Sequence, residues 1–423
     1  MKQKVCLTTL EFPPDVGGVG ESVYRIARML LELNYEVHVA VFHFSKRKKT
    51  IQRAKRKTIE QDGILVHRLR AAVRTTEQYT PGIMIMDYRS EIYFQLQLLH
   101  KQFDFDLFHS FFIKETGFLT TLLALENQRP VINSIRGSDL HKHIFDPQQH
   151  AQLCWTLEKA SWLTFVSHDL FKRATVLLPN LEAKSSVFWN SIQPVDFDNL
   201  PTPELEKNCQ GIVIGSVGRF RDKKGLEYLL DACAQLSAEN IELTLLLVGH
   251  FVAREQEYWE EELKNSGIAD RIIITGTLSR AEAMAYLPQM DVFMIPSLND
   301  GCPNALLEAM LASRAIVGTN VDAIGEILTD GVDGLVVNPG SSEELAVALR
   351  KLSRSPELIK ELGKAAKKKV LEQLAPAVEQ ENWAKVYQQV LPQPNLQQFS
   401  SLGGTKFYCS REQGTGNREQ KTN

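Results

Sequence analysis

The chain has 423 residues, with 48 Lys and Arg against 51 Asp and Glu, and a formal net charge of −3 at pH 7. This length predicts two or three domains that each bury a core, and the charge excludes a large positive surface for nucleic acid. A hydrophobic fraction of 43 % is that of a folded globular protein.

The six cysteines are scattered, and none forms a Cys-x-x-Cys pair, so a zinc site is not expected. The apolar run Val5 to Leu10 is too short for the core of a signal peptide, and no segment approaches 18 apolar residues. The sequence therefore predicts a cytoplasmic protein with reduced thiols.

In the first half, short runs rich in β-branched residues alternate with helical patterns. The predicted strands are Val5 to Leu10, Glu36 to Phe42, Ile64 to Leu69 and Pro130 to Ile135. This alternation predicts a parallel sheet covered by helices on both faces, with ligands at the carboxyl ends of its strands.

Near Asn190 the alternation stops, and residues 193–208 are predicted to form a linker because they contain three prolines and several turn formers. A second series of strands follows, at Gly211 to Gly218, Leu243 to Gly249, Arg271 to Gly276 and Asp291 to Pro296. We therefore expect two Rossmann-like doubly wound domains, residues 1–192 and 209–374, that face a central ligand-binding cleft.

The end of the chain has two different patterns. Residues 357–391 are helical in pattern, and Trp383, Val386 and Val390 form an apolar stripe that must pack on another element. Residues 393–423 are rich in Gln, Ser, Gly, Asn and Thr, which predicts a disordered tail.

Three loops are candidates for chemistry. The first, Phe12 to Ser22, follows a strand, contains Gly17 and Gly18 and opens a helix. Glycines let the backbone approach a ligand, and the free amides at the start of a helix attract a phosphate or a sugar hydroxyl. A plain tight turn would have the same sequence.

The second loop, Gly218 to Gly225, places Arg219 and Lys224 between a strand and a helix. A guanidinium fork beside a compact ammonium suits a diphosphate. The alternative is a solvated basic turn.

In the third loop, Ser297 to Met310, Pro303 stands where helices often begin, with Asp300 before it and Glu308 more than a turn into the helix. One carboxylate can face a sugar and the other the hydroxyls of a ribose. The alternative makes Asp300 a helix cap and Glu308 a surface residue.

Together these loops, with Ile135 to Leu140 and Val332 to Val337, resemble the retaining glycosyltransferases of family 4, which have the two-domain GT-B fold. The resemblance covers about Val5 to Leu391. It implies an enzyme that needs no metal and no cofactor, an acceptor bound by the first domain, a nucleotide diphosphate sugar bound by the second, and a helix over 375–392 that returns to the first domain.

The resemblance also implies the site residues. Arg219, Lys224 and Asp300 match the catalytic segment that stabilises the leaving diphosphate and holds the sugar. The donor is expected at Gly18, Gly249, Thr275, Gly276, Thr277, Leu278, Gly301, Cys302, Pro303, Asn304 and Glu308. The acceptor is expected at Gly17, His109, Arg136 and Asp139.

Several of these assignments have alternatives. Asp300 stands where the family has a glutamate and is one methylene shorter, so its reach to the sugar can differ. His109 suits a hydrogen-bonded core position as well as the cleft. Arg136 and Asp139 suit a structural ion pair as well as contact with acceptor or sugar.

A separate basic run, Ser45 to Lys57, carries eight Lys and Arg residues on a predicted loop or helix. Such a run can adhere to anionic lipid, which suits peripheral contact with the inner face of a membrane through Lys46 to Lys57 and a lipid-linked acceptor. A solvated basic loop is the alternative.

The sequence thus predicts transfer of a hexose from a nucleotide diphosphate sugar to a glycan, lipid-linked or small-molecule hydroxyl. The alternatives are a nucleotide-sugar-binding protein with little turnover, or an epimerase or phosphorylase on the same fold.

Overall fold

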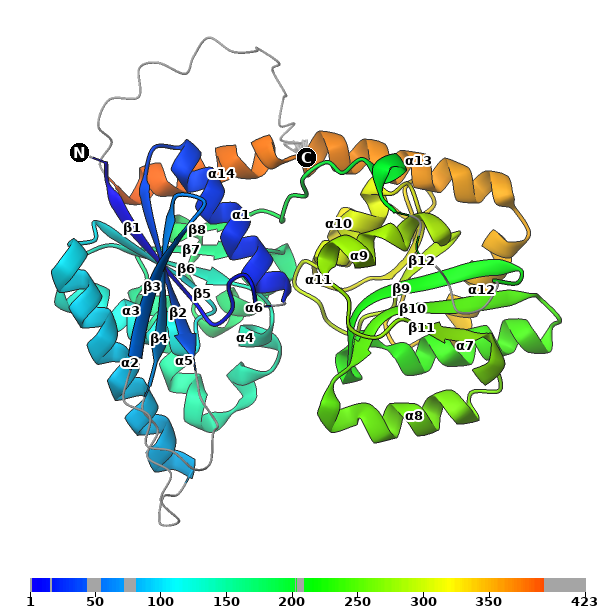
Figure 1. The fold of residues 1–423 in the computed structure, drawn as a ribbon, viewed down its shortest axis with the longest axis horizontal. Coiled ribbons are helices and arrows are strands. Elements are labelled where there is room, and N and C mark those ends of the chain that lie inside the picture. The colour runs from blue at the N-terminus through cyan, green and yellow to red at the C-terminus, as the bar shows by residue number, and fades with distance from the viewer. Residues whose placement is uncertain are drawn as a thin grey trace, which may run out of the picture.

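The computed structural model describes residues 2–15, 17–43, 55–71, 81–201, 203 and 209–391. Two parallel sheets with flanking helices form two lobes (Figure 1). We call the first sheet with helices α1 to α6 the first domain, and the second sheet with helices α7 to α13 the second domain.

The first sheet has eight strands in the order β3-β4-β2-β1-β5-β6-β7-β8. The strands are β1 (Lys4–Thr9), β2 (Glu36–His43), β3 (Lys55–Gln61), β4 (Ile64–Arg70), β5 (Leu107–Phe111), β6 (Val131–Ile135), β7 (Trp162–Phe165) and β8 (Ser185–Val187). The helices are α1 (Gly18–Glu32), α2 (Pro81–Phe103), α3 (Glu115–Glu126), α4 (Ser138–His141), α5 (Pro147–Lys159) and α6 (His168–Leu177). All neighbouring strands are parallel except β3 and β4.

The second sheet has six parallel strands in the order β11-β10-β9-β12-β13-β14. The strands are β9 (Ile212–Phe220), β10 (Leu243–Phe251), β11 (Ile272–Ile274), β12 (Val292–Ile295), β13 (Ala315–Thr319) and β14 (Leu335–Val337). The helices are α7 (Leu226–Ala238), α8 (Gln256–Asn265), α9 (Arg280–Ala285), α10 (Asn304–Leu311), α11 (Asp322–Ile327), α12 (Ser342–Ser353) and α13 (Pro356–Gln373).

Helix α14 (Pro376–Val390) crosses from the second domain to the first (Figure 1). It follows α13 after a break at Pro376, since proline cannot continue the hydrogen bonding of the preceding helix. Trp383 and Val386 are buried in one cluster with Val5 of β1 and Ile26 of α1. This confirms the expected GT-B-type fold and the return of the C-terminal helix.

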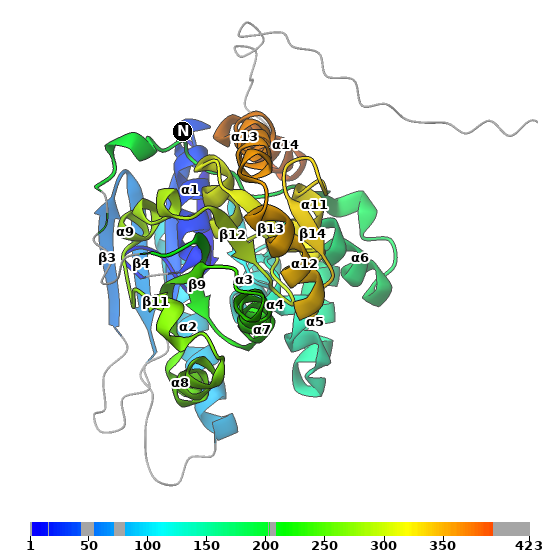
Figure 2. The ribbon, with the colours of Figure 1, turned by 90° about the vertical axis from the view of Figure 1, so that its right-hand side faces the viewer.

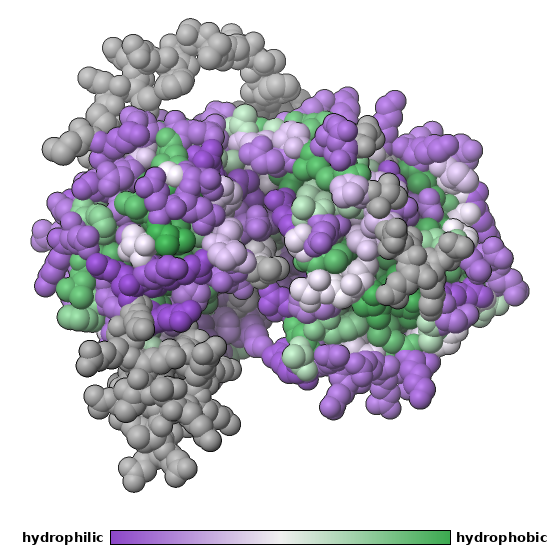
Figure 3. Space-filling view, viewed as in Figure 1, coloured by the Kyte–Doolittle hydropathy of each residue, from purple (hydrophilic) through white to green (hydrophobic). Residues whose placement is uncertain are grey.

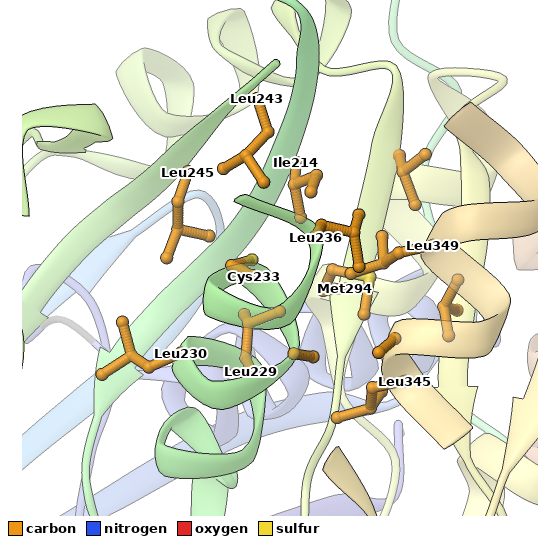
Figure 4. Packing of buried hydrophobic residues seen from close by; sticks show 14 of the residues in the cluster. Ile214, Leu229, Leu230, Cys233, Leu236, Leu243, Leu245, Met294, Leu345 and Leu349 are labelled. Atoms are coloured by element: carbon orange, nitrogen blue, oxygen red, sulfur yellow. The ribbon is translucent and has the colours of Figure 1, made fainter. Parts of the chain in front are cut away.

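The second domain has two buried apolar clusters, and one of them lies between the sheet and helices α7 and α12. Leu229 and Leu236 of α7 pack with Leu245 of β10 and Leu349 of α12 (Figure 4). Seen from the side, α12 lies beside α7 (Figure 2). This core holds the strands whose carboxyl ends carry the predicted ligand loops.

Two expectations change or stay open. The loop or helix expected over Ser45 to Lys57 is wrong at its end, because β3 begins at Lys55 and pairs antiparallel with β4. Residues 44–54 and the tail 392–423 lie outside the described residues. The domain boundaries at 192, 208 and 374 stay predictions.

No helix in the described ranges is long and apolar enough to cross a membrane.

Candidate functional site

Each sheet has a point where the strand order reverses. The chain adds β2 on one side of β1 and β5 on the other, and it adds β10 and β12 on opposite sides of β9. Ligands of open α/β sheets bind at the carboxyl ends of strands at such points. Loops from both sheets meet there around a cleft of about 460 Å³. In Figure 3 the surface is hollowed between the two lobes, and hydrophilic residues dominate its rim.

The structure brings about half of the predicted site residues to this cleft. Its lining includes Gly18, Arg136, Arg219, Lys224, Asp300, Cys302, Pro303 and Asn304. The described lining does not include Gly17, His109, Asp139, Gly249, Thr275, Gly276, Thr277, Leu278, Gly301 or Glu308. The cleft thus gathers the three predicted loops and part of the second domain's donor segment.

Lys224 ends the short 3-10 turn that follows β9. Gly225 has φ +64°, and a Cβ atom there would lie 2.0 Å from the carbonyl oxygen of Pro296, so only glycine lets this loop pack against the end of β12. The close approach brings the Lys224 ammonium to 2.5 Å from Oδ2 of Asp300. The two predicted catalytic loops are therefore joined by an ion pair.

Asp300 is ionised in this setting. Burial opposes the charged form, but Lys224 and then Lys223 outweigh it and hold the pKa of Asp300 below its usual range. Its carboxylate pairs with Lys224 and its backbone amide donates to Asp322, so the structure does not support the alternative of a helix cap.

The cleft has more cations than carboxylates. Its lining cations are Arg136, Arg219, Arg221, Lys223 and Lys224, and its lining carboxylates are Glu11 and Asp300. Burial also raises the pKa of Glu11, partly offset by Arg219. The N-terminus of α10 adds free backbone amides, since Asn304 and Ala305 line the cleft. Such a surface favours an anion with several oxygens.

Sequence reasoning missed Glu11, which lies at the carboxyl end of β1, where parallel sheets place ligand contacts. A Cβ atom on Gly17 would fall 2.0 Å from Oε2 of Glu11, so Gly17 makes room for this carboxylate. The position of Glu11 after a predicted strand was a signal that could have identified it.

Asn190, also missed, links both sides of the cleft. Its Oδ1 accepts from Arg136 at 2.9 Å, and its Nδ2 donates to the carbonyl oxygen of Cys302 at 3.0 Å. Arg136 lies 5.9 Å from the centroid of the Phe111 ring. Burial lowers the pKa of Arg136 to about 10, so the guanidinium is charged at neutral pH. Nothing in the local sequence marks Asn190, because its partners lie far away in the chain.

Glu308 is buried with 7 % exposure and is not the surface residue of the alternative prediction. Its Oε1 accepts from Nε of Arg280 at 2.7 Å, and the same guanidinium lies 3.7 Å from Glu21 of the first domain. Arg280 therefore forms an ion pair with the carboxylate that is predicted to bind a ribose.

Gly249 and Thr275 lie together, beside the cleft lining. The Gly249 amide donates to Thr275 Oγ1 at 3.1 Å, and a Cβ on Gly249 would lie 1.9 Å from the carbonyl oxygen of Gly218. Leu278 packs against the second-domain core. The expected contact of residues 275–278 with a nucleotide base stays a prediction.

His109 lies in the core of the first domain, not at the cleft. It is fully buried, and its ring nitrogens bond Tyr387 Oη at 2.9 Å and Ser134 Oγ at 2.8 Å. Burial lowers the pKa of His109 to about 3. The expected acceptor contact of His109 is therefore wrong, because α14 covers this strand and occupies the ring.

Asp139 is also buried, and its carboxylate accepts from the backbone amides of Ile113 at 3.0 Å and Arg136 at 3.1 Å. Burial raises the pKa of Asp139 to about 6 despite these bonds. The carboxylate thus shapes the loop that carries Arg136, and the expected contact of Asp139 with acceptor is wrong.

Two family models match the chain. Glycosyltransferase Family 4 matches residues 16–192, and Glycosyl transferases group 1 matches residues 211–355. Together they match well over half of the chain.

Curated relatives are similar at low identity. The 2-deoxystreptamine glucosyltransferase of Streptomyces kanamyceticus is 28 % identical over 48 % of this chain, but the chain spans only 54 % of that protein. The N-acetyl-alpha-D-glucosaminyl L-malate synthase of Bacillus anthracis is 22 % identical over 92 % of this chain and 98 % of the relative.

Solved structures share the fold. Sucrose-phosphate synthase from Thermosynechococcus elongatus has a TM-score of 0.73 at 17 % identity and covers 92 % of this chain and 99 % of its own. Anabaena HepE in complex with UDP has a TM-score of 0.68 at 17 % identity over 91 % of this chain and 99 % of its own. With the two family models, these findings show that the chain belongs to the family 4 glycosyltransferases and has the GT-B fold.

Proposed function

We propose that this protein is a retaining glycosyltransferase that moves a hexose from a nucleotide diphosphate sugar to a hydroxyl group of a glycan, lipid-linked or small-molecule acceptor. The observation that carries the proposal is the cleft between the two sheets, where Lys224 pairs with Asp300 and cations outnumber carboxylates. Relatives named for sugar transfer and the UDP held by a protein of the same fold support it.

In this proposal Arg219 and Lys224 bind the diphosphate. The bond between the anomeric carbon and the β-phosphate oxygen breaks, the acceptor oxygen bonds the same carbon, and the acceptor proton passes to the leaving phosphate. Negative charge grows on the diphosphate as this happens, so fixed cations lower the barrier. Asp300 keeps Lys224 oriented and faces the sugar.

The first domain supplies the acceptor side. Arg136 is a charged group on the first-domain side of the cleft, and the described contacts of its guanidinium are the side-chain amide of Asn190 and the ring of Phe111. We assign it to acceptor or sugar oxygens. On the donor side, Glu308 is assigned to the ribose, and it must then exchange its bond with Arg280.

Thermal unfolding with UDP, GDP or ADP, without added metal, tests the donor site. A diphosphate at about 100 times its Kd adds about 2.7 kcal/mol to the free energy of unfolding. We expect one nucleotide to raise Tm and Lys224→Ala to remove the shift. Lys264→Ala, on the exposed side of α8, is the matched control and should keep it.

Absence of any nucleotide-induced shift in the wild-type protein would contradict the proposal. A shift without sugar transfer to any hydroxyl would favour a nucleotide-sugar-binding protein with little turnover.

A further inference from the structure

A second contact between the domains is linked to the Asp300–Lys224 pair, which we call the diphosphate clamp. Nε2 of His141, the last residue of α4, lies 3.0 Å from Oδ1 and 2.9 Å from Oδ2 of Asp322, the first residue of α11. The two side chains are 8 % and 1 % exposed. This bond therefore joins the first domain to the second in a largely dry setting, where it is stronger than at the surface.

Asp322 passes the contact on to the catalytic loop. Its Oδ2 accepts from the backbone amide of Asp300 at 2.8 Å, and the Asp300 side chain holds Lys224. Asp322 has φ +43°, a region that favours glycine. A residue held there is over-determined by its surroundings, and such positions cluster at functional sites.

The loop that carries Asp300 is also fixed from the other side. A Cβ atom on Gly301 would lie 2.4 Å from the carbonyl oxygen of Arg136, so the backbone of the first domain packs directly on this loop. The loop that carries Asp300 thus lies between Arg136, just before α4, and Asp322. A change at either contact displaces the backbone from which the Asp300 carboxylate reaches Lys224.

We propose that His141 is a positioning residue that, through Asp322 and the Asp300 backbone, sets the Asp300–Lys224 pair for binding the donor diphosphate. This inference rests on the proposed function. His141 belongs to the first domain, whereas Asp300 and Lys224 belong to the second. The geometry of the Asp300–Lys224 pair therefore depends on how the two domains are positioned relative to each other.

Other charges near His141 do not replace its role. Asp169 offers a carboxylate oxygen within 4.8 Å of the His141 and Asp322 atoms, but it pairs with Arg173 at 2.6 Å. Lys223 lies 3.9 Å from Oδ1 of Asp300 and does not contact the Asp300 backbone amide. Among the described residues, the hydrogen-bonded link from the first domain to that amide runs through Asp322.

The test measures the Kd of UDP by calorimetry for the wild type, His141→Leu and His141→Gln. Leucine cannot donate, and we expect its Kd to rise about tenfold, the scale of a lost hydrogen bond to a charged group. The amide of glutamine can donate from a similar position, so His141→Gln should stay within about twofold of the wild type.

His168→Leu is the matched control. His168 also faces a carboxylate of α11 from the first domain, at 3.2 Å from Glu326, but it is 60 % exposed. The Glu326 carboxylate accepts hydrogen bonds from His168 and Asp169 of α6 and from Trp189, and among the described residues it accepts none from the Asp300 loop. We expect His168→Leu to bind UDP with the Kd of the wild type. The Kd values of GDP and ADP are measured in the same way, to identify which base the site binds.

A double-mutant cycle separates positioning from a general loss of structure. In an Asp300→Asn background, His141→Leu should weaken UDP binding by less than about twofold, because the group through which it acts is already changed. Equal UDP affinity of wild type and His141→Leu, or an undiminished effect in the Asp300→Asn background, overturns the inference. If the wild type binds none of the three nucleotides, the proposed function itself fails.

Discussion

The interiors of the two domains differ in polarity. In the first domain, His38, His67, His100 and His109 are all buried. The second-domain cluster around Leu229 and Leu245 is apolar, and no histidine is buried among the described residues of that domain (Figure 4). The second domain instead places its charges at strand ends around the cleft. The comparison teaches that the second-domain side of the cleft, with the donor groups, is supported by an apolar core. The first-domain side is supported by a hydrogen-bonded interior.

The largest expected effect removes a buried charge of the first-domain interior. Glu379 accepts from Arg25 Nε at 2.8 Å and from the Ser191 amide at 2.9 Å, and its side chain is 2 % exposed. Glu379→Ala leaves the Arg25 guanidinium, which is only 11 % exposed, without its partner, so we expect the free energy of unfolding to fall by about 4 kcal/mol in urea titrations. A loss below about 1 kcal/mol would show that this interior tolerates an unpaired cation.

Glu381→Ala on the same helix is the matched control. Glu381 is 68 % exposed and pairs with Lys385 one turn later. We expect a change within about 0.5 kcal/mol, because exposed ion pairs contribute little.

The next effect is on the pH dependence of stability. Burial lowers the folded-state pKa of His109 to about 3, whereas an exposed histidine in the unfolded chain titrates near about 6.5. As the pH falls from about 6.5 to about 3, the unfolded chain binds a proton that the folded protein does not. The free energy of unfolding therefore decreases as the pH falls below about 6.5. This single group accounts for about 2 kcal/mol between pH 7 and pH 5.

His109→Gln should remove that part of the difference, measured by urea unfolding at both pH values. Leu229→Ala in the apolar core provides the contrast: it should cost about 3 kcal/mol at pH 7 and the same at pH 5. An unchanged pH dependence in His109→Gln would contradict the comparison of the two interiors.

The smallest effect concerns the bridge between the domains. Arg280 is 41 % exposed and holds the Glu308 carboxylate at 2.7 Å. If Glu308 binds the ribose, Arg280→Ala removes a weak competitor, and the Kd of UDP should fall about twofold in calorimetry. Lys159→Ala, an exposed pair of the first domain, should leave it unchanged. A several-fold rise in Kd would instead mean that Arg280 contacts the nucleotide.

Much of the fold was readable because parallel strands are apolar runs. Strand β10 is buried over its first six residues, and it was predicted almost to its bounds. Strand β3 was missed because Lys55–Gln61 lies at the edge of the sheet and has no apolar alternation. In the site, the three loops could be predicted from glycines, cations and strand ends.

Other site features depend on distant partners. Arg280 meets Glu308 and Glu21 only after the domains fold, and Asn190 bridges residues far apart in the chain. Whether His109 faced the cleft or the core was decided by Tyr387, almost three hundred positions away. Local pattern cannot resolve such contacts.

Helix α14 has a consequence for the order of events during synthesis. Trp383, Val386, Tyr387 and Leu391 complete the hydrophobic cluster of the first domain. A chain made from its N-terminus produces these side chains only after the whole second domain has been translated. During synthesis the first sheet and α1 therefore form this cluster without the side chains of α14, and a helix made after the second domain completes the core of the domain made before it.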